Sequence, residues 1–128
     1  MKEKMKILVG LDGSDYSTWA LMEAISIAKK FSGHITVITV YKRGSKEEAD
    51  KIQLKANQLL DEEKIDCNLL SILGSNPSRA LVETAENEKF DLIVVGSRGL
   101  GTAAAFLIGS VSKKVVSNAN CDVLVVKK

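Results

Sequence analysis

Two glycine-containing turns hold the residues of this 128-residue chain whose types and spacing suit ligand chemistry. The first is Gly10-Leu11-Asp12-Gly13-Ser14. The second begins Gly96-Ser97-Arg98-Gly99, and Gly109-Ser110 stands ten residues after Gly99. Glycine permits a tight bend and lets another group approach the backbone closely. Exposed N–H groups at a helix start favour an anion, and Ser110 is predicted to cap the following helix or to donate its hydroxyl to phosphate. The second turn is therefore predicted to form a phosphate cradle.

The turns match neither of the more familiar phosphate-binding motifs. The chain has no G-x-x-x-x-G-K-[ST] sequence, so a P-loop is not supported. Gly96-x-x-Gly99-x-Gly101 also differs from the dinucleotide pattern G-x-G-x-x-G, and it follows the fourth predicted strand rather than the first. From the residues alone, plain turn geometry for the glycines and a helix-capping role for Asp12 remain open alternatives.

Short β-branched runs alternate with amphipathic stretches along the whole chain. Strands are predicted at 7–11, 35–40, 65–73, 91–95 and 123–126, and helices at 17–31, 45–64, 77 to about 88, and 111–119. Ser14 or Asp15 is predicted to cap the first helix, and Gly33 to close it. At least one helical turn is predicted near the alanine run 103–105. Strict alternation predicts a single α/β domain over residues 1–128, with a parallel sheet covered by helices on both faces.

The two turns occupy equivalent places in this scheme, because each directly follows a predicted strand. Ligands of open parallel sheets bind beyond the carboxyl ends of the strands, where the strand order reverses. If the first and fourth strands are neighbours, the two turns face each other across a crevice. The residues alone leave that strand order open.

The spacing G-x-x-G-x₉-G-S, together with the opening Asp12-Gly13-Ser14, resembles the nucleotide-binding motif of the ATP-binding universal stress proteins. The resemblance extends over essentially the whole chain. It implies a doubly wound, five-stranded parallel sheet in the order 3-2-1-4-5, Rossmann-like, with ATP at the switch between strands one and four. Two features depart from the usual pattern of the family. One is the alanine run 103–105, and the other is Asp122, at a position where the family commonly has proline.

The resemblance also implies residue roles. Asp12 would bind the ribose hydroxyls, Gly10 would pass close to the nucleoside, and the backbone of Val40 would meet the adenine edge. Mg²⁺ or Mn²⁺ bridging the phosphates is a further expectation. The residues expected around the phosphates are Gly96, Ser97, Arg98, Gly99, Gly109, Ser110, Val111 and Ser112.

The last strand is the expected contact of a homodimer, which the resemblance implies. Its residues Val123, Leu124, Val125 and Val126 form an apolar run, and an exposed edge of that kind tends to pair with another strand. Antiparallel pairing with its own copy is the expected mode.

Composition excludes several classes of partner. The net charge of +2, from 18 basic and 16 acidic residues, is too small for a surface that binds nucleic acid. Aromatic residues make up only 5% of the chain, so few side chains are available for nucleobases to stack on. No apolar run reaches the ~20 residues of a membrane span, and the charged start does not resemble a signal peptide. Cys67 and Cys121 are isolated from each other in sequence, which fits a cytoplasmic location.

Three functions stay open. The leading hypothesis is a regulatory stress-response module that binds ATP, since no general base with a positioned nucleophile is visible and His34, the one histidine, lies away from the loop. A slow ATPase or nucleotide hydrolase is the alternative, with Mg²⁺ held by Asp12 and phosphate oxygens. The second alternative is an interaction protein that binds no nucleotide.

Overall fold

The fold alternates strands and helices in chain order, as the sequence predicts. The structure is a computed structural model that describes residues 4–98 and 108–127, so Gly99 and the alanine run lie outside the described residues. The elements run in the order β1 (Lys6–Gly10), α1 (Asp15–Phe31), β2 (His34–Tyr41), α2 (Lys46–Glu62), β3 (Cys67–Leu73), α3 (Pro77–Asn87), β4 (Leu92–Gly96), α4 (Ser110–Asn118) and β5 (Asp122–Val126).

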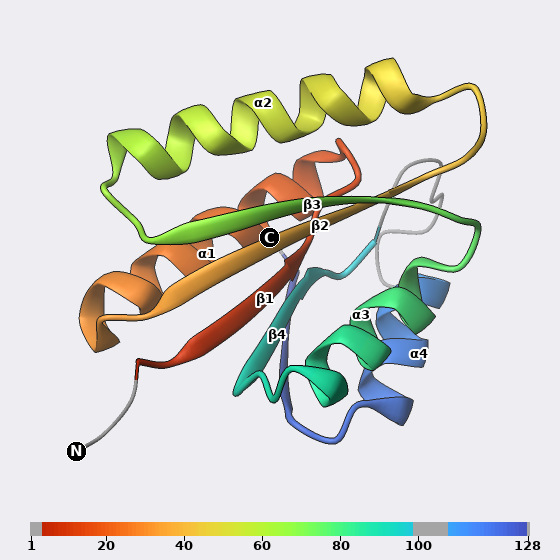
Figure 1. Ribbon diagram of the computed structural model, residues 1–128. Helices are drawn as coiled ribbons and strands as arrows, with labels where there is room; N and C mark the ends of the chain where they lie inside the picture. The colour runs from red at the N-terminus through yellow and green to blue at the C-terminus, as the bar shows by residue number, and fades with distance from the viewer. Residues whose placement is uncertain (1–3, 99–107, 128) are drawn as a thin grey trace.

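The strands form one five-stranded parallel sheet in the order β3-β2-β1-β4-β5, which confirms the predicted doubly wound topology (Figure 1). Strand β1 pairs with β2 on one side and with β4 on the other. The chain therefore winds outward from β1 in one direction and then returns to its other side. The carboxyl ends of β1 and β4 lie next to each other at this reversal, as a ligand crevice requires.

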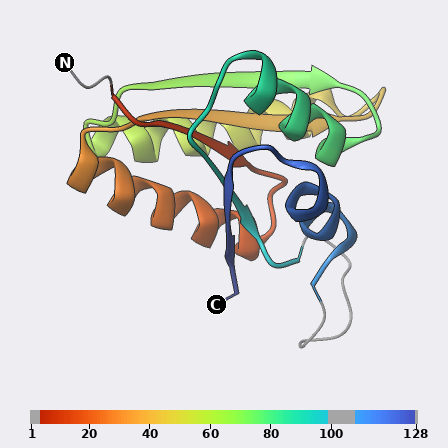
Figure 2. The ribbon, with the colours of Figure 1, turned by 90° about the horizontal axis from the view of Figure 1, so that it is seen from below.

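Helices α1 and α2 cover one face of the sheet, and α3 and α4 cover the other (Figures 1 and 2). Successive side chains of β1 point to opposite faces, and Ile7, Leu8 and Val9 have no exposed surface. Ile7 and Val9 belong to the core beneath α1 and α2, whereas Leu8 packs with the residues of α3 and α4. Burial on both faces is the reason that the three central residues of β1 are all apolar rather than alternating with polar residues.

The ends of α1 are set by serines. Ser14 is the N-cap, and its side chain accepts the Ser17 N–H at 3.1 Å. The prediction that Gly33 closes the helix is corrected by the backbone: Ser32 adopts the left-handed conformation, with φ of 53°. Gly33 follows it and donates its N–H to the Ala28 carbonyl at 2.8 Å.

Strand β3 begins later than predicted. The chain leaves α2 through Lys64, whose φ of 57° reverses its direction, so the regular strand starts at Cys67 rather than at Ile65. Within the described residues, no helix combines the length and the hydropathy that crossing a bilayer would need.

Candidate functional site

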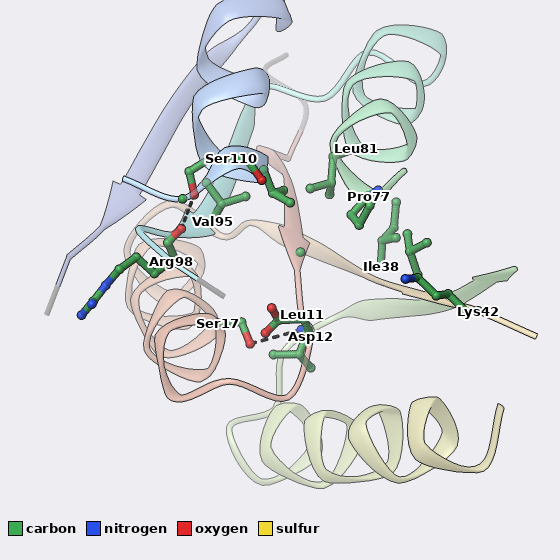
Figure 3. Close-up of a pocket in the computed structure, with 16 residues that line it drawn as sticks. Leu11, Asp12, Ser17, Ile38, Lys42, Pro77, Leu81, Val95, Arg98 and Ser110 are labelled. Carbon is green, nitrogen blue, oxygen red and sulfur yellow. Dashed lines mark hydrogen bonds between the residues drawn. The ribbon is translucent and has the colours of Figure 1, made fainter. Parts of the chain in front are cut away.

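A cavity of about 440 Å³ opens at the carboxyl ends of β1 and β4. Nine of the predicted site residues line it: Gly10, Asp12, Val40, Gly96, Arg98, Gly109, Ser110, Val111 and Ser112. Figure 3 shows the cavity between the end of β1 and the starts of α3 and α4. The structure thus brings together two turns that are separated by more than eighty positions in the sequence, as the strand order requires.

Asp12 is held in the turn between β1 and α1. Its carboxylate oxygen Oδ1 accepts the Ser14 N–H at 2.9 Å, and its own N–H donates to Ser17 Oγ at 3.2 Å. Gly13 has φ of +90°, a conformation that suits glycine, and it turns the chain between Asp12 and Ser14. Figure 3 shows the carboxylate of Asp12 on the cavity side of the turn. The helix-capping role of this turn falls to Ser14, which leaves Asp12 in the cavity wall.

The second turn is closed by backbone hydrogen bonds. The Gly109 N–H donates to the Ser97 carbonyl at 2.7 Å, and the Ser97 N–H donates to the Val126 carbonyl at 2.7 Å. The buried Ser112 hydroxyl donates to the carbonyl of Gly96. Ser97 is itself buried and is not one of the residues that line the cavity, so its place in the site is to join the turn to β5.

Gly96 is glycine because α1 packs on it. A Cβ at this position would lie 2.7 Å from the backbone carbon and oxygen of Tyr16, closer than real Cβ atoms come. The close approach predicted for the second turn is therefore made by a helix of the same chain. At Gly10 a Cβ would meet Leu81 Cδ1 at 2.9 Å, the end of a flexible side chain.

The start of α4 faces the cavity. Gly109 is the N-cap, in an extended conformation with φ of −66° and ψ of 162°, and no side-chain cap bond is made. The prediction that Ser110 caps the helix is therefore corrected: Ser110 is the first helical residue, and its exposed side chain lines the cavity. The first N–H groups of a helix lack intrahelical partners and favour an anion, so this edge of the cavity is chemically suited to phosphate.

The opposite wall is apolar and comes partly from α3, an element without a predicted site residue. Ile38 and Val40 contribute from β2, and Pro77 and Leu81 from the first turns of α3. An apolar wall facing a helix start suits a ligand with an apolar part and an anionic part. A detectable signal was present: β2 and β3 also end at this edge of the sheet, and α3 begins four residues after Leu73, the last residue of β3.

In addition to Asp12, two cationic side chains line the cavity. Lys42, just beyond β2, was not predicted, and Figure 3 shows it at the end near Pro77. Arg98 lies at the other end, where its guanidinium carbon is 4.2 Å from the ring centroid of Tyr16, and Figure 3 shows its side chain directed away from Asp12. The described lining residues therefore carry two positive charges and one negative charge, which suits an anionic ligand.

The described groups whose pKa values are shifted are not among the residues that line this cavity. His34, at the opposite end of β2, donates its Nδ1–H to Asp66 Oδ2 at 3.0 Å, and this hydrogen bond is the main cause of a lowered pKa at Asp66. Burial raises the pKa of both thiols, Cys67 and Cys121. Among residues 4–98 and 108–127, no group of three or more His, Cys, Asp or Glu side chains is arranged to hold a metal ion.

Comparisons with known proteins place the chain in a family. The model of the universal stress protein family matches residues 4–127. A universal stress protein of Methanocaldococcus jannaschii is 36% identical over 140 residues, covering 96% of this chain and 82% of the relative. One from Thermus aquaticus is 32% identical over 136 residues, covering 94% and 97%.

A solved structure shows the same fold at comparable identity. The crystal structure of a universal stress protein in complex with cAMP is 35% identical, has a TM-score of 0.82, and matches 98% of each chain. The family match, the curated relatives and this structure all extend over nearly the full chain. The chain therefore belongs to the universal stress protein family.

Proposed function

We propose that this chain is a regulatory module that binds an adenine nucleotide, ATP foremost, in the cavity at the ends of β1 and β4. The observation that carries the proposal is the pairing of an apolar wall with a helix start across one cavity of about 440 Å³. Ligand sites of roughly 300–1,000 Å³ with few polar groups are typical for small molecules. The relative that is 35% identical was solved with cAMP, an adenine nucleotide, which supports the ligand class.

Each part of a nucleotide has a chemical counterpart in the wall. The base would lie against Val40, Pro77 and Leu81, which supply apolar contact. The carboxylate of Asp12 can accept hydrogen bonds from ribose hydroxyls. The phosphates would meet the first N–H groups of α4 and the hydroxyl of Ser110, where a negative charge is favoured.

A divalent cation fits this donor set only together with phosphate. Asp12 is the one carboxylate among the described residues that line the cavity. Mg²⁺ is commonly held by one or two carboxylates, water and phosphate oxygens, so Mg²⁺ or Mn²⁺ would arrive with the nucleotide and neutralise its charge. Asp12 would then contact either the metal or the ribose, and these contacts are separable by measuring binding with and without the cation.

Binding without rapid turnover is the activity we propose. The described lining residues include neither a histidine nor a second carboxylate that could act as a general base with Asp12. Slow hydrolysis is the alternative outcome, and it would appear as ADP and phosphate formed in proportion to enzyme and time. A chain that binds no nucleotide would instead act through protein contacts alone.

Calorimetric titration of nucleotide-stripped protein with ATP, AMP and cAMP, each with and without Mg²⁺, tests the proposal. We expect micromolar dissociation constants that Asp12→Ala and Gly109→Ala weaken. Asp15→Ala is the matched control, because Asp15 is the neighbouring exposed acidic residue of α1 and does not line the cavity. Absence of binding by the unaltered protein, or equal losses in the Asp12 and Asp15 variants, would reject this site.

We further propose that β5 pairs with its copy in a homodimer. Strand β5 lies at the sheet edge, where Val123, Leu124 and Val125 pack against the cores on the two faces but remain partly exposed, whereas Val126 is fully within the core. A partly exposed apolar edge strand favours pairing with another strand.

Sedimentation velocity tests the dimer. Val125→Lys places a charge on the edge strand and should yield monomer; because Val125 also packs against the core, thermal melting first establishes that this variant is folded. Leu54→Lys introduces the same charge on the exposed face of α2, where Leu54 is 58% exposed, and should leave the dimer intact. A monomeric unaltered protein, or a Val125→Lys protein that stays dimeric, would contradict the proposed interface.

A further inference from the structure

Ser17 lies behind Asp12 in the first turn of α1. Its side chain is buried, with 4% of the residue exposed, and it forms part of the cavity lining. Ser17 Oγ accepts the Asp12 N–H at 3.2 Å and donates its proton to the Ser14 carbonyl at 3.0 Å. The Ser17 backbone N–H in turn donates to Ser14 Oγ at 3.1 Å. The hydroxyl thus links the helix start to the backbone of the residue that faces the ligand.

These bonds fix the orientation of the Ser17 hydroxyl. A serine hydroxyl has one proton to donate, and here the Ser14 carbonyl receives it. A lone pair of the oxygen then faces the Asp12 N–H, so the Ser17 hydroxyl acts as an acceptor of fixed direction rather than rotating freely. Thr18 provides a comparison, because its hydroxyl also donates to the Ser14 carbonyl, at 3.2 Å, but makes no bond to Asp12.

Asp12 is consequently fixed at two points. Ser17 fixes its backbone, and the Ser14 N–H fixes its carboxylate through Oδ1 at 2.9 Å. To accept hydrogen bonds from two adjacent hydroxyls, a carboxylate must hold both its orientation and its distance from the ligand, since hydrogen bonds weaken steeply as their angle departs from linear. Of the two restraints, the one from Ser17 sets where the backbone of Asp12 lies.

We propose that Ser17 is a positioning residue for ribose recognition, acting through Asp12. The proposal rests on the proposed function, because it concerns the part of the nucleotide that Asp12 would contact. Without the Ser17 hydroxyl, the Asp12 N–H loses its partner in a partly buried turn and the turn relaxes. The carboxylate then leaves the position at which it meets the ribose.

The test compares two nucleotides that differ only at the ribose. Dissociation constants are measured by calorimetry for ATP and for 2′,3′-dideoxy-ATP, which keeps the base and phosphates. The proteins are the unaltered chain, Ser17→Ala, Ser17→Cys, Thr18→Ala, Asp12→Ala and the Asp12→Ala/Ser17→Ala double variant. Cysteine nearly keeps the volume of serine but is a weak acceptor, so it separates hydrogen bonding from packing. Thermal melting establishes that each variant is folded.

We expect Ser17→Ala and Ser17→Cys to weaken the binding of ATP by about tenfold, near the lower limit for losing a hydrogen bond between a ribose hydroxyl and the charged Asp12. The same variants should change the binding of 2′,3′-dideoxy-ATP by less than about twofold. Thr18→Ala should leave both constants unchanged. In the Asp12→Ala background, Ser17→Ala should have no further effect on ATP, since both act on the same contact.

Equal weakening of both nucleotides by Ser17→Ala would show that Ser17 supports the fold or the phosphates, and would overturn the proposal. Unchanged affinities, or full additivity with Asp12→Ala, would overturn it as well. These results are distinct from failure of the proposed function, in which the unaltered protein binds neither nucleotide.

Discussion

Gly96, the last residue of β4, lies directly against the first turn of α1, and Gly96→Ala is the sharpest test of why that position is glycine. A Cβ would lie 2.7 Å from the backbone carbon and oxygen of Tyr16 and 2.8 Å from its Cβ. Comfortable carbon contacts begin near 3.5 Å, so helix and strand must separate by roughly 0.8 Å. Because most of the atoms in the way are backbone, rotation of a side chain cannot relieve the contact.

The expected cost lies in the upper part of the range for overpacked cores, about 2–3 kcal/mol. In a chain of this size, each kcal/mol lowers Tm by about 3–6 °C, so a fall of roughly 6–18 °C is expected. Urea unfolding of the nucleotide-free protein measures the free energy of unfolding directly, and scanning calorimetry gives Tm.

Gly74→Ala is the matched control for this experiment. Its Cβ would meet Val40 Cγ1 at 3.9 Å, an ordinary contact, and the backbone of Gly74 has no positive φ. This variant should be neutral or more stable by about 0.4–1 kcal/mol, because alanine restricts the unfolded chain. A Gly96→Ala protein within about 0.5 kcal/mol of the unaltered chain would refute the packing explanation and return Gly96 to a role in ligand contact alone.

Three further predictions concern charge and thiol chemistry. Lys42→Glu should weaken ATP by more than about fivefold at low salt and by less at high salt, because an exposed charge acts on the ligand through screened attraction; titration at two ionic strengths measures this. The pKa of Asp66 is lowered chiefly by its hydrogen bond from His34, so its contribution to stability is present above the ordinary carboxyl value of 3.8 and is lost as pH falls through the lower folded-state value. Asp66→Asn should therefore reduce the difference in urea midpoint between neutral pH and about pH 3. Burial raises the pKa of Cys67 and Cys121, so alkylation of the folded protein at mildly alkaline pH should be slower than that of the unfolded chain, and mass spectrometry after timed quenching compares the two.

The elements of the fold could be predicted from the sequence because burial and periodicity agree. Strand β1 is apolar at Ile7, Leu8 and Val9, and all three are fully buried between two helical layers. Such a run predicts a central parallel strand but does not say which strands are its neighbours. The order β3-β2-β1-β4-β5 was expected from the family resemblance, because apolar runs specify burial without specifying pairing.

The wall of the cavity formed by the two glycine turns and α4 was predicted from the sequence, whereas most of the wall formed by β2 and α3 was not. The glycine turns gave Asp12, Gly96 and the start of α4, which all line the cavity. Lys42 and Leu81 were missed because an exposed lysine after a strand and a leucine in a helix are ordinary residues by type. Lys42 reaches the cavity because β2 ends at this edge of the sheet, whereas Leu81 reaches it because α3 packs beside the end of β2. The first placement follows from the strand pattern, but the second is a property of the folded chain.

The aromatic side chains at the start of α1 place a fluorophore within two ring contacts of the cavity wall. Trp19 is the single tryptophan of the chain, and its ring meets that of Tyr16 edge-on, with centroids 5.1 Å apart. The guanidinium of Arg98 rests on the same tyrosine, so the cavity wall and the indole are linked through one ring. A ligand whose phosphates drew Arg98 off this ring would alter the electrostatic field at the indole. Intrinsic fluorescence would then follow occupancy of the cavity in real time, with no label attached to the protein.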